Sequence, residues 1–429
     1  MVDTMQVPEL IQFDEWQDDY ANRVAVMRTS AVRDLFAAAS RSDIISLSGG
    51  MPDIRNLPLD TVVSKVAADA VRIEGVEGLQ YGNTTGREQT KELVCQLVED
   101  QDIHVRPNTV TITSGAQQAL DLLAKAFINP GDIIISEGPT YLGALQAFSA
   151  YEPSVITIPL DEEGMQTDLL AEELARLVAQ SPTGRHGVKF LYTIPTFQNP
   201  GGVTMSLKRR KHLLELAHQY KLTVIEDDPY SHLRYSGEPV PALRSMDEKV
   251  IYLGTVSKVF APGLRTGWII APRPILDKIN MVKQGSDLCG SALNQVIVEH
   301  YFNDTDWRGE LEKLRVLYAE RRDAMLQALG EFFPAEATWT HPAGGFFVWV
   351  TLPEYVDTPQ LLSVALDKGV TFVPGDGCYP GGSGMGKNTM RIAFCYEDPE
   401  NIREAIKRLG EVINERLELY RAFIDAGAL

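Results

Sequence analysis

The segment from Thr255 to Trp268 has the sequence T-V-S-K-V-F-A-P-G-L-R-T-G-W and comes after an apolar run, V-I-Y-L, that is typical of a buried strand. Lys258 lies here among hydroxyl side chains, and Arg265 follows a Pro-Gly break. Because burial disfavours a charged amine, this setting suits a lysine that is neutral part of the time. The hydroxyls and the guanidinium suit a bound dianion. The alternative is an ordinary solvated lysine, and the rest of the chain has to distinguish the two.

The composition limits the class of protein. A chain of 429 residues is long enough for one large core and a second core, and 44% hydrophobic with 23% charged residues is an ordinary globular composition. The net charge of −18 repels phosphate backbones, so we expect no nucleic-acid partner.

Neither export nor membrane insertion is indicated by the sequence. The N-terminal residues are acidic and lack the apolar core of a signal peptide, and there is no run of 18 apolar residues. The four cysteines have no C-x-x-C spacing, which fits a reduced compartment and neither a disulfide framework nor a zinc site. We therefore expect a cytoplasmic protein without a membrane partner.

Strands and helices alternate through the middle of the chain, which is the pattern of a mainly parallel sheet. Helices are expected at residues 119–127 and 206–220. Apolar runs predict strands at residues 109–113, 132–136, 155–159, 188–193, 222–227 and 250–253.

A polar or aromatic residue stands at the end of five of these strands: Ser114, Tyr141, Asn199, Asp227 and Lys258. Asn199 and Asp227 are 28 residues apart, and Asp227 and Lys258 are 31 residues apart. A β-α-β unit takes about 30 residues or more, so these three residues follow successive strands. The sequence therefore predicts a ligand site at the carboxyl edge of the sheet.

Taken singly, these residues also have structural interpretations. Ser114 opens a helix, where it can either cap the helix or mark a backbone seat for a phosphate. Tyr141 can be a core aromatic residue or can stack on a flat ring. Asp227 can belong to an Asx turn before a proline or can face a buried cation. It is their common place at one edge that favours a site.

A second, smaller domain is predicted after a mainly helical stretch from about residue 274 to 329. Strands are expected there at 345–350 and 389–394, with a closing helix at 397–423. Arg391 lies in the second of these strands, which is otherwise apolar. A buried guanidinium needs a partner, which is either an internal carboxylate or the carboxylate of a ligand.

Residues 381–388, G-G-S-G-M-G-K-N, nearly match a nucleotide-binding loop. The loop lacks the final hydroxyl, and a strand is expected after it where the motif requires a helix, so we expect no ATP site. The seven histidines show no metal-ligand spacing, and no metal is predicted.

Together the motifs resemble those of the class I/II aminotransferases, fold-type I enzymes that use pyridoxal 5'-phosphate (PLP). The segments D-D-P-Y and S-K-x-x-x-x-G-x-R-x-G carry the resemblance, which extends over nearly the whole chain and is closest to the 2-aminoadipate, kynurenine and aromatic aminotransferase branch. It implies an α/β fold, with a mainly parallel sheet sandwiched by helices in a large domain and a smaller α+β domain. The implied ranges are 1–45 for an N-terminal arm and helix, 46–290 for the large domain and 291–429 for the small domain.

The resemblance also implies catalytic roles. Lys258 forms the Schiff base with PLP, Asp227 pairs with the pyridine nitrogen, and Tyr230 and Asn199 contact the 3-oxygen of the ring. Asp227 is preferred to Asp228 because the aspartate of the family lies three residues before its tyrosine.

The remaining implied contacts divide between cofactor and substrate. Tyr141 stacks on the ring, and the phosphate is held by Ala116, Gln117, Ser257 and Arg265 near Ser114, with Thr255 as a further candidate and Tyr81 supplied by the partner chain of a homodimer with shared active sites. Ala116 replaces a serine that is common at this position. The substrate α-carboxylate is gripped by Arg391, with Gly50 and Asn199 nearby.

Arg33 is the candidate for reading a distal substrate carboxylate. It lies in S-A-V-R-D-L, on a helix expected at about residues 30–39, and this segment resembles the S-x-x-R-E-L helix of 2-aminoadipate aminotransferases. The alternative is a solvated arginine on a helix surface.

The implied function is ping-pong transamination of an L-amino acid (2-aminoadipate, aromatic or branched-chain) with 2-oxoglutarate as acceptor. A DNA-binding regulator with an aminotransferase-like domain is disfavoured, because the residues before S-L-S-G-G are few and acidic. A lyase or decarboxylase on the same fold is a further alternative. Arg391 and Tyr141 favour transamination.

Overall fold

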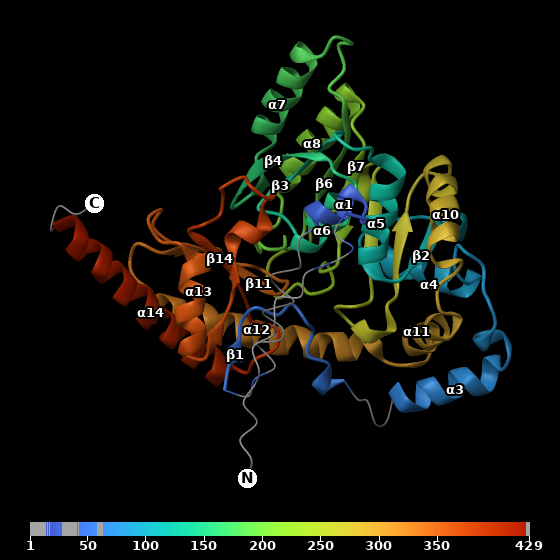
Figure 1. Cartoon of the computed structure of the whole chain (residues 1–429). Helices are drawn as coiled ribbons and strands as arrows, with labels where there is room; N and C mark the ends of the chain where they lie inside the picture. Colours follow the sequence, from blue (N-terminus) through green and yellow to red (C-terminus); the bar gives the residue numbers. More distant parts are fainter. Residues whose placement is uncertain are drawn as a thin grey trace.

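The computed structural model describes residues 14, 16, 18–27, 41, 43–57 and 63–425. Figure 1 shows a large sheet flanked by helices and, beside it, a smaller part that is built around the C-terminal helices. The helix expected at 30–39, with Arg33, lies outside the described residues.

Within the described residues the large sheet has eight strands in the order β2-β9-β8-β7-β6-β3-β4-β5. Their bounds are β2 (Val110–Thr113), β3 (Ile133–Gly138), β4 (Ser154–Asp161), β5 (Gly164–Met165), β6 (Val188–Thr193), β7 (Val224–Asp228), β8 (Ile251–Thr255) and β9 (Gly267–Ile270). Neighbours from β4 through β3, β6 and β7 to β8 are parallel, whereas β9 is antiparallel to both β2 and β8. The mainly parallel sheet is confirmed, and each predicted strand of this region overlaps an observed one.

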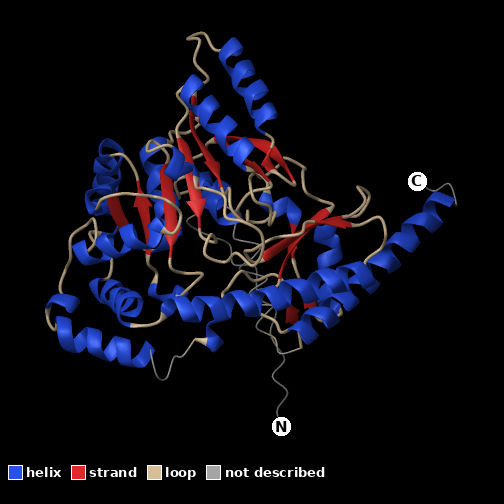
Figure 2. Ribbon diagram, turned by 180° about the vertical axis from the view of Figure 1, so that it is seen from behind, coloured by secondary structure: helices blue, strands red, loops and turns tan. Residues whose placement is uncertain are grey.

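Helices cover both faces of the large sheet, as Figure 2 also shows. One face carries α5 (Gly115–Phe127), α6 (Leu142–Ser149) and α10 (Arg273–Asp287). The other carries α7 (Thr167–Gln180), α8 (Leu207–Tyr220) and, further along, α4 (Glu88–Glu99). Strands between two such layers are buried on both sides, which is why β8 begins as a continuous apolar run, whereas the buried β7 changes after Val224 and Ile225 to three acidic residues.

The smaller part is built on an antiparallel sheet with the strand order β10-β11-β14-β13 among the described residues. Its elements are α12 (Trp307–Phe332), β10 (Thr338–Trp339), β11 (Phe347–Thr351), α13 (Thr358–Asp367), β13 (Val373–Pro374), β14 (Thr389–Ala393) and α14 (Pro399–Asp425). β1 (Ile45–Ser46) pairs in parallel with β12 (Val370–Thr371). The strands predicted at 345–350 and 389–394 and the closing helix are confirmed, and a strand does follow residues 381–388.

The predicted domain limits at residues 45 and 290 stay predictions. α11 (Ala292–Asp304) lies just beyond the second limit and packs against α3 (Ser64–Glu74) and α4. The long α12 then passes beneath both parts and packs along α14 (Figure 2). The other α-helices of the described residues are α1 (Asn22–Val26) and α9 (Leu243–Met246). No helix in the described ranges has both the length and the apolar character needed to cross a membrane.

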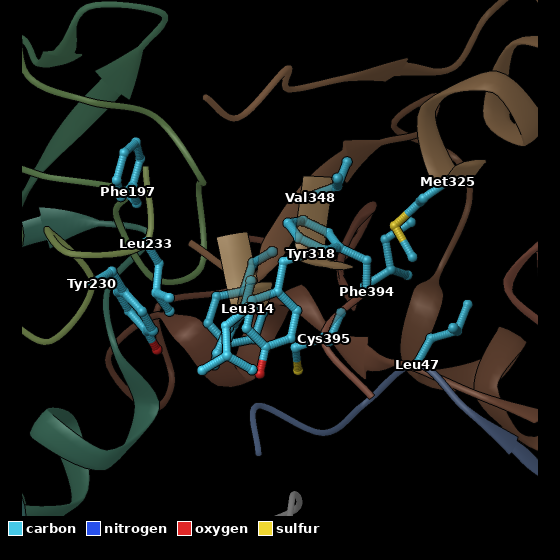
Figure 3. Close-up of a cluster of buried hydrophobic side chains, with 14 of the residues drawn as sticks. Leu47, Phe197, Tyr230, Leu233, Leu314, Tyr318, Met325, Val348, Phe394 and Cys395 are labelled. Atoms are coloured by element: carbon cyan, nitrogen blue, oxygen red, sulfur yellow. The ribbon is translucent and has the colours of Figure 1, made fainter. Parts of the chain in front are cut away.

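One hydrophobic cluster joins the two parts. Figure 3 shows Tyr230 and Leu233, from the loop after β7, lying near Tyr318 of α12 and Cys395 after β14. The ring of Tyr230 meets that of Phe346 edge-to-face, with centroids 5.5 Å apart. This shared core fixes the small sheet against the carboxyl edge of the large one.

Candidate active site

The five strand ends that were predicted to meet do lie along one edge of the large sheet. β6, β7 and β8 are adjacent and parallel, so Asn199, Asp227 and Lys258 come to the same side. β9 runs in the opposite direction and begins at this edge, where Gly267 pairs with both Thr113 and Thr255. Arg265 therefore arrives at the site just before β9 begins.

A cavity of about 350 Å³ opens at this edge. The predicted residues that line it are Gly50, Ala116, Gln117, Tyr141, Asn199, Asp227, Tyr230, Thr255, Ser257, Lys258, Arg265 and Arg391. Ser114 does not line the cavity, Tyr81 is 80% exposed and does not line it either, and Arg33 lies outside the described residues.

Lys258 lines this cavity and is half-buried. Its Nζ donates a hydrogen bond of 2.8 Å to the carbonyl of Gly50 and lies 5.8 Å from the ring centre of Tyr230. Burial lowers the pKa of Lys258 to about 8, and the positive charges of Arg391 and Arg265 act in the same direction. The solvated-lysine alternative is thereby excluded, and the amine is closer to neutrality than a free lysine.

Asp227 presents one unused oxygen. Its Oδ2 accepts a hydrogen bond of 2.7 Å from the hydroxyl of Tyr192, whereas the buried Oδ1 has no partner within the described residues. Burial raises the pKa of Asp227 to about 7, while the hydrogen bond from Tyr192 lowers it. Because an unpaired buried acceptor is costly, Oδ1 fits a ligand N–H donor such as a protonated ring nitrogen.

The neighbouring Asp228 is engaged elsewhere. It accepts hydrogen bonds of 3.0 Å from the hydroxyl of Tyr252 and from the backbone N–H of Ser231, and it does not line the cavity. Of the two acids in D-D-P-Y, the structure thus brings Asp227 into the site, as the sequence motif indicated.

The first turn of α5 forms a seat for an anion. The Ser114 side chain makes no capping hydrogen bond, and the backbone N–H of Ser114 donates to Gln118 Oε1 at 2.7 Å. The following first-turn N–H groups have no intrahelical acceptors, and they carry the positive end of the helix dipole. Arg265 Nη2 donates to the Ser114 carbonyl at 3.4 Å. Backbone donors, a guanidinium and the Ser257 hydroxyl converge here as a phosphate dianion requires.

Glycine makes this close approach possible. Gly115 has a φ of +72°, and a Cβ there would lie 2.3 Å from Arg265 Nη2. Across β9, a Cβ on Gly267 would lie 2.9 Å from the backbone nitrogen of Ala116. Because Gly115 and Gly267 have no side chain, the backbone and Arg265 can come close together around the anion seat.

The side chain of Gln117 has a task that the sequence did not suggest. Its Nε2 donates to the Gly143 carbonyl at 2.7 Å, and its Oε1 accepts from the Tyr141 hydroxyl at 3.3 Å. This amide therefore holds the loop that carries Tyr141, which leaves the backbone N–H of Gln117 for the predicted phosphate contact.

Arg391 reaches the cavity from β14 of the small sheet. It is 5% exposed and lies over the Phe347 ring, and it donates to Asn199 Oδ1 at 3.1 Å and to the Ser48 carbonyl at 2.7 Å. It forms no ion pair with a carboxylate of the described residues, and its Nε is buried without a partner there. A ligand carboxylate is the partner that its fork geometry fits.

Several lining residues were missed in the sequence. Phe347 lines the cavity from an apolar strand, and Tyr192, which does not line it, contacts the lining residue Asp227 from another such strand. Both resemble core residues in the sequence, because only the pairing of strands reveals which face each side chain takes. The further lining residues are Met51, Leu142, Gly143, Gln146, Ile194 and Pro229. Only Pro229, in D-D-P-Y, belongs to a motif. Leu142, Gly143 and Gln146 come from α6, and which of its residues face the cavity depends on tertiary packing.

Several known proteins are similar to this chain in sequence and in fold. The family model for aminotransferase class I and II matches residues 42–409. Aromatic-amino-acid aminotransferase 1 of Thermococcus litoralis is 45% identical, over 94% of this chain and 96% of that protein. A multiple substrate aminotransferase from Thermococcus profundus has a TM-score of 0.88 at 42% identity, covering 94% of this chain and 100% of that one.

A third relative bears on the cofactor. The α-aminoadipate aminotransferase of Thermus thermophilus, in complex with N-(5'-phosphopyridoxyl)-L-leucine, has a TM-score of 0.85 at 35% identity and covers 94% of this chain and 99% of that one. The free Asp227 Oδ1 and the anion seat beside Arg265 fit the ring and the phosphate of such a cofactor. The chain belongs to the class I and II aminotransferases, and its cofactor is pyridoxal 5'-phosphate.

Proposed function

We propose that this aminotransferase moves the amino group of an L-amino acid to 2-oxoglutarate in two half-reactions, with ping-pong kinetics. The donors we propose are 2-aminoadipate and aromatic or branched-chain amino acids. The observation that carries the proposal is the meeting of Lys258, Asp227 Oδ1 and Arg391 in one cavity. A base, a carboxylate for the ring and a receptor for the substrate carboxylate are the protein groups that this chemistry uses.

Arg391 binds the α-carboxylate of the amino acid. Its guanidinium is buried, is held by the Ser48 carbonyl and Asn199, and has no acidic partner in the described chain. A substrate held in this way shares the cavity with Lys258.

Lys258 moves the proton at the substrate Cα. Burial brings its pKa to about 8, so a useful fraction of the amine is neutral near physiological pH. Asp227 Oδ1 would accept the ring N–H of the cofactor, and Tyr230 and Asn199, which also line the cavity, would contact its 3-oxygen. When bound, the cofactor supplies a carbonyl that condenses with amines and a ring that withdraws electrons from Cα.

The side-chain end of the cavity supports a mixed set of donors. Met51, Leu142, Ile194 and Phe347 form apolar walls that suit aromatic and branched side chains. Related proteins with aromatic amino acids, multiple substrates and α-aminoadipate in their names support the same range.

A distal carboxylate needs a further cation. Among the described residues the cavity is lined by the cations Lys258, Arg265 and Arg391, and each already has a proposed task. We propose Arg33 as the group that meets the distal carboxylate of 2-aminoadipate or 2-oxoglutarate.

We also propose a homodimer with shared active sites. Between residues 71 and 81, beside α3 at one end of the molecule (Figure 1), Ile73, Val76, Leu79 and Tyr81 are all exposed, Val76 by 79% and Tyr81 by 80%. A cluster of exposed apolar side chains marks an interaction surface, and Tyr81 then reaches the phosphate seat of the partner. Light scattering should give the mass of two chains, and a monomer at micromolar concentration would contradict the dimer.

Single half-reactions test the proposed function. The PLP-loaded enzyme, mixed with one amino acid and no acceptor, should show a change in cofactor absorbance for phenylalanine, leucine and 2-aminoadipate. Phenethylamine, which lacks the carboxylate that Arg391 binds, is the matched control and should react far more slowly. Adding 2-oxoglutarate should restore the spectrum and release glutamate. An unchanged spectrum with all three donors would contradict the proposal.

A further inference from the structure

Tyr192 is a fully buried tyrosine whose hydroxyl reaches the active site. It lies in β6, is 0% exposed, and pairs in register with Ile225 of the adjacent β7. Its ring meets Phe148 of α6 edge-to-face, with centroids 5.5 Å apart, inside the cluster between sheet and helices. The ring is therefore fixed by packing, and its hydroxyl is a rigid donor.

The acceptor of this donor is Asp227 Oδ2, at 2.7 Å. Since Tyr192 occupies one carboxylate oxygen, the carboxylate is held in a single orientation, with Oδ1 left without a protein partner. The bond also matters for charge. The titratable groups that act on the Asp227 carboxylate are the like charges of Asp228 and Glu137, the opposite charge of Lys258, and Tyr192 itself.

Most of these surroundings work against an ionised aspartate. Burial and the two neighbouring carboxylates raise the pKa of Asp227, whereas the Tyr192 hydrogen bond is the largest influence that lowers it. A hydrogen bond donated to the charged form stabilises that form.

We propose that Tyr192 is a positioning residue for the cofactor: its hydroxyl orients Asp227 so that Oδ1 faces the ring nitrogen, and it keeps that carboxylate charged. The proposal rests on the proposed role of Asp227. Tyr192 touches neither cofactor nor substrate in it, and acts only through the aspartate.

The chain contains a matched control on the opposite face of the same sheet. Tyr252 of β8 is 1% exposed, and its hydroxyl lies 3.0 Å from Oδ2 of Asp228, the acid that does not line the cavity. Tyr192 belongs to the cluster under α5 and α6, whereas Tyr252 belongs to the cluster on the other side. The Tyr252 hydroxyl also contacts Gln101 Oε1. Two tyrosines of similar burial thus place their hydroxyls against two adjacent aspartates, and only one of these aspartates lines the cavity.

The experiment compares Tyr192→Phe with Tyr252→Phe in the PLP-loaded enzyme, after thermal unfolding has confirmed that both variants fold. Each change removes one hydroxyl from a buried ring. Losing a hydrogen bond to a charged group costs about a factor of ten or more, so Tyr192→Phe should release PLP about ten-fold faster than the wild type. The absorbance of the bound cofactor should change with it.

The pH profile gives a second readout. Without the Tyr192 hydroxyl the pKa of Asp227 rises, so the acidic limb of the kcat profile should move to higher pH by about one unit. Tyr252→Phe should keep the cofactor release rate, the spectrum and the acidic limb of the wild type. In an Asp227→Asn background, Tyr192→Phe should add nothing further, because the two residues act as one unit.

Equal behaviour of the two variants in cofactor release and in the acidic limb would overturn the proposal, and so would an additive effect in the Asp227→Asn background. These outcomes are separable from a failure of the proposed function. If the wild type forms no glutamate with any donor, that function fails, while cofactor release and absorbance still decide the role of Tyr192.

Discussion

The two sheets contribute to the active site in different ways. The large sheet supplies Asn199, Asp227 and Lys258 from the ends of three adjacent parallel strands. The small antiparallel sheet supplies Arg391 from the interior of β14, where it pairs with Trp349 on one side and Val373 on the other. The site therefore combines residues that follow the ends of strands in the large sheet with one residue from the middle of a strand in the small sheet.

This difference has a chemical counterpart. The carboxyl edge of the large sheet carries the half-buried amine of Lys258 and the buried acid Asp227, whose pKa burial raises to about 7. The small sheet presents the guanidinium of Arg391, which has no carboxylate partner in the described chain. We infer that the large sheet carries the proton chemistry and the small sheet binds the substrate.

The largest effect is expected from the large sheet. Lys258→Ala removes the amine that we propose moves the proton at Cα, so kcat should fall by about 10⁴-fold. The absorbance due to cofactor bound to Lys258 should also be lost, while thermal stability stays near that of the wild type. If purified Lys258→Ala completes both half-reactions at a comparable rate, the division between the two sheets is wrong.

The next largest effect is expected from the small sheet. Arg391→Ala should lower kcat/KM for amino acids by about 100-fold or more, because a buried charge pair with the substrate is lost. Most of the loss should appear in KM, and the spectrum of the bound cofactor should not change. Arg391→Lys keeps the positive charge but loses the two-pronged guanidinium, so its kcat/KM should lie between those of Arg391→Ala and the wild type. An effect confined to kcat would assign Arg391 to the chemistry instead.

A smaller effect is expected in the stability of the cofactor-free protein. Because the pKa of Asp227 is raised on folding, from 3.8 to about 7, the folded state is favoured at low pH. This contribution is fully present below about pH 4 and is lost as the pH rises through about 7. Urea unfolding should therefore show wild type losing stability relative to Asp227→Asn over this range. Parallel curves for the two proteins would show that the acid is not buried as described.

The smallest effect is expected from Arg33→Ala. If this arginine meets a distal carboxylate, KM should rise about ten-fold for 2-aminoadipate and 2-oxoglutarate and stay unchanged for leucine, since one charge-assisted hydrogen bond is lost. Steady-state kinetics with matched dicarboxylic and branched donors measure the difference. An equal change for leucine would remove Arg33 from the substrate site.

Much of the large sheet could be predicted from sequence. Most of its strands are buried on both faces and therefore contain apolar runs. The intervals from Asn199 to Asp227 and from Asp227 to Lys258 each match the length of one β-α-β unit. Parallel strands joined by helices bring their carboxyl ends to one edge whatever the details of packing. The site residues that follow strand ends were predicted for this reason.

Other parts of the site could not be predicted. Three contacts depend on strand register and on the paths of loops. They are the hydrogen bond between Tyr192 and Asp227, the close approach of Arg265 to Gly115, and the hydrogen bond between Tyr141 and Gln117. Sequence spacing does not contain this information, because a one-residue shift in register turns every side chain to the other face.

The amino-acid sequence by itself determined the layers of the fold and the edge at which the site lies, and the resemblance of its motifs pointed to Lys258, Asp227 and Arg391. Only the tertiary structure decided which oxygen of Asp227 is free, that Arg391 has no carboxylate partner in the described chain, and that Asp228 turns away. The physical reason is that periodicity and spacing are local properties, whereas hydrogen bonds between buried groups depend on how distant segments pack.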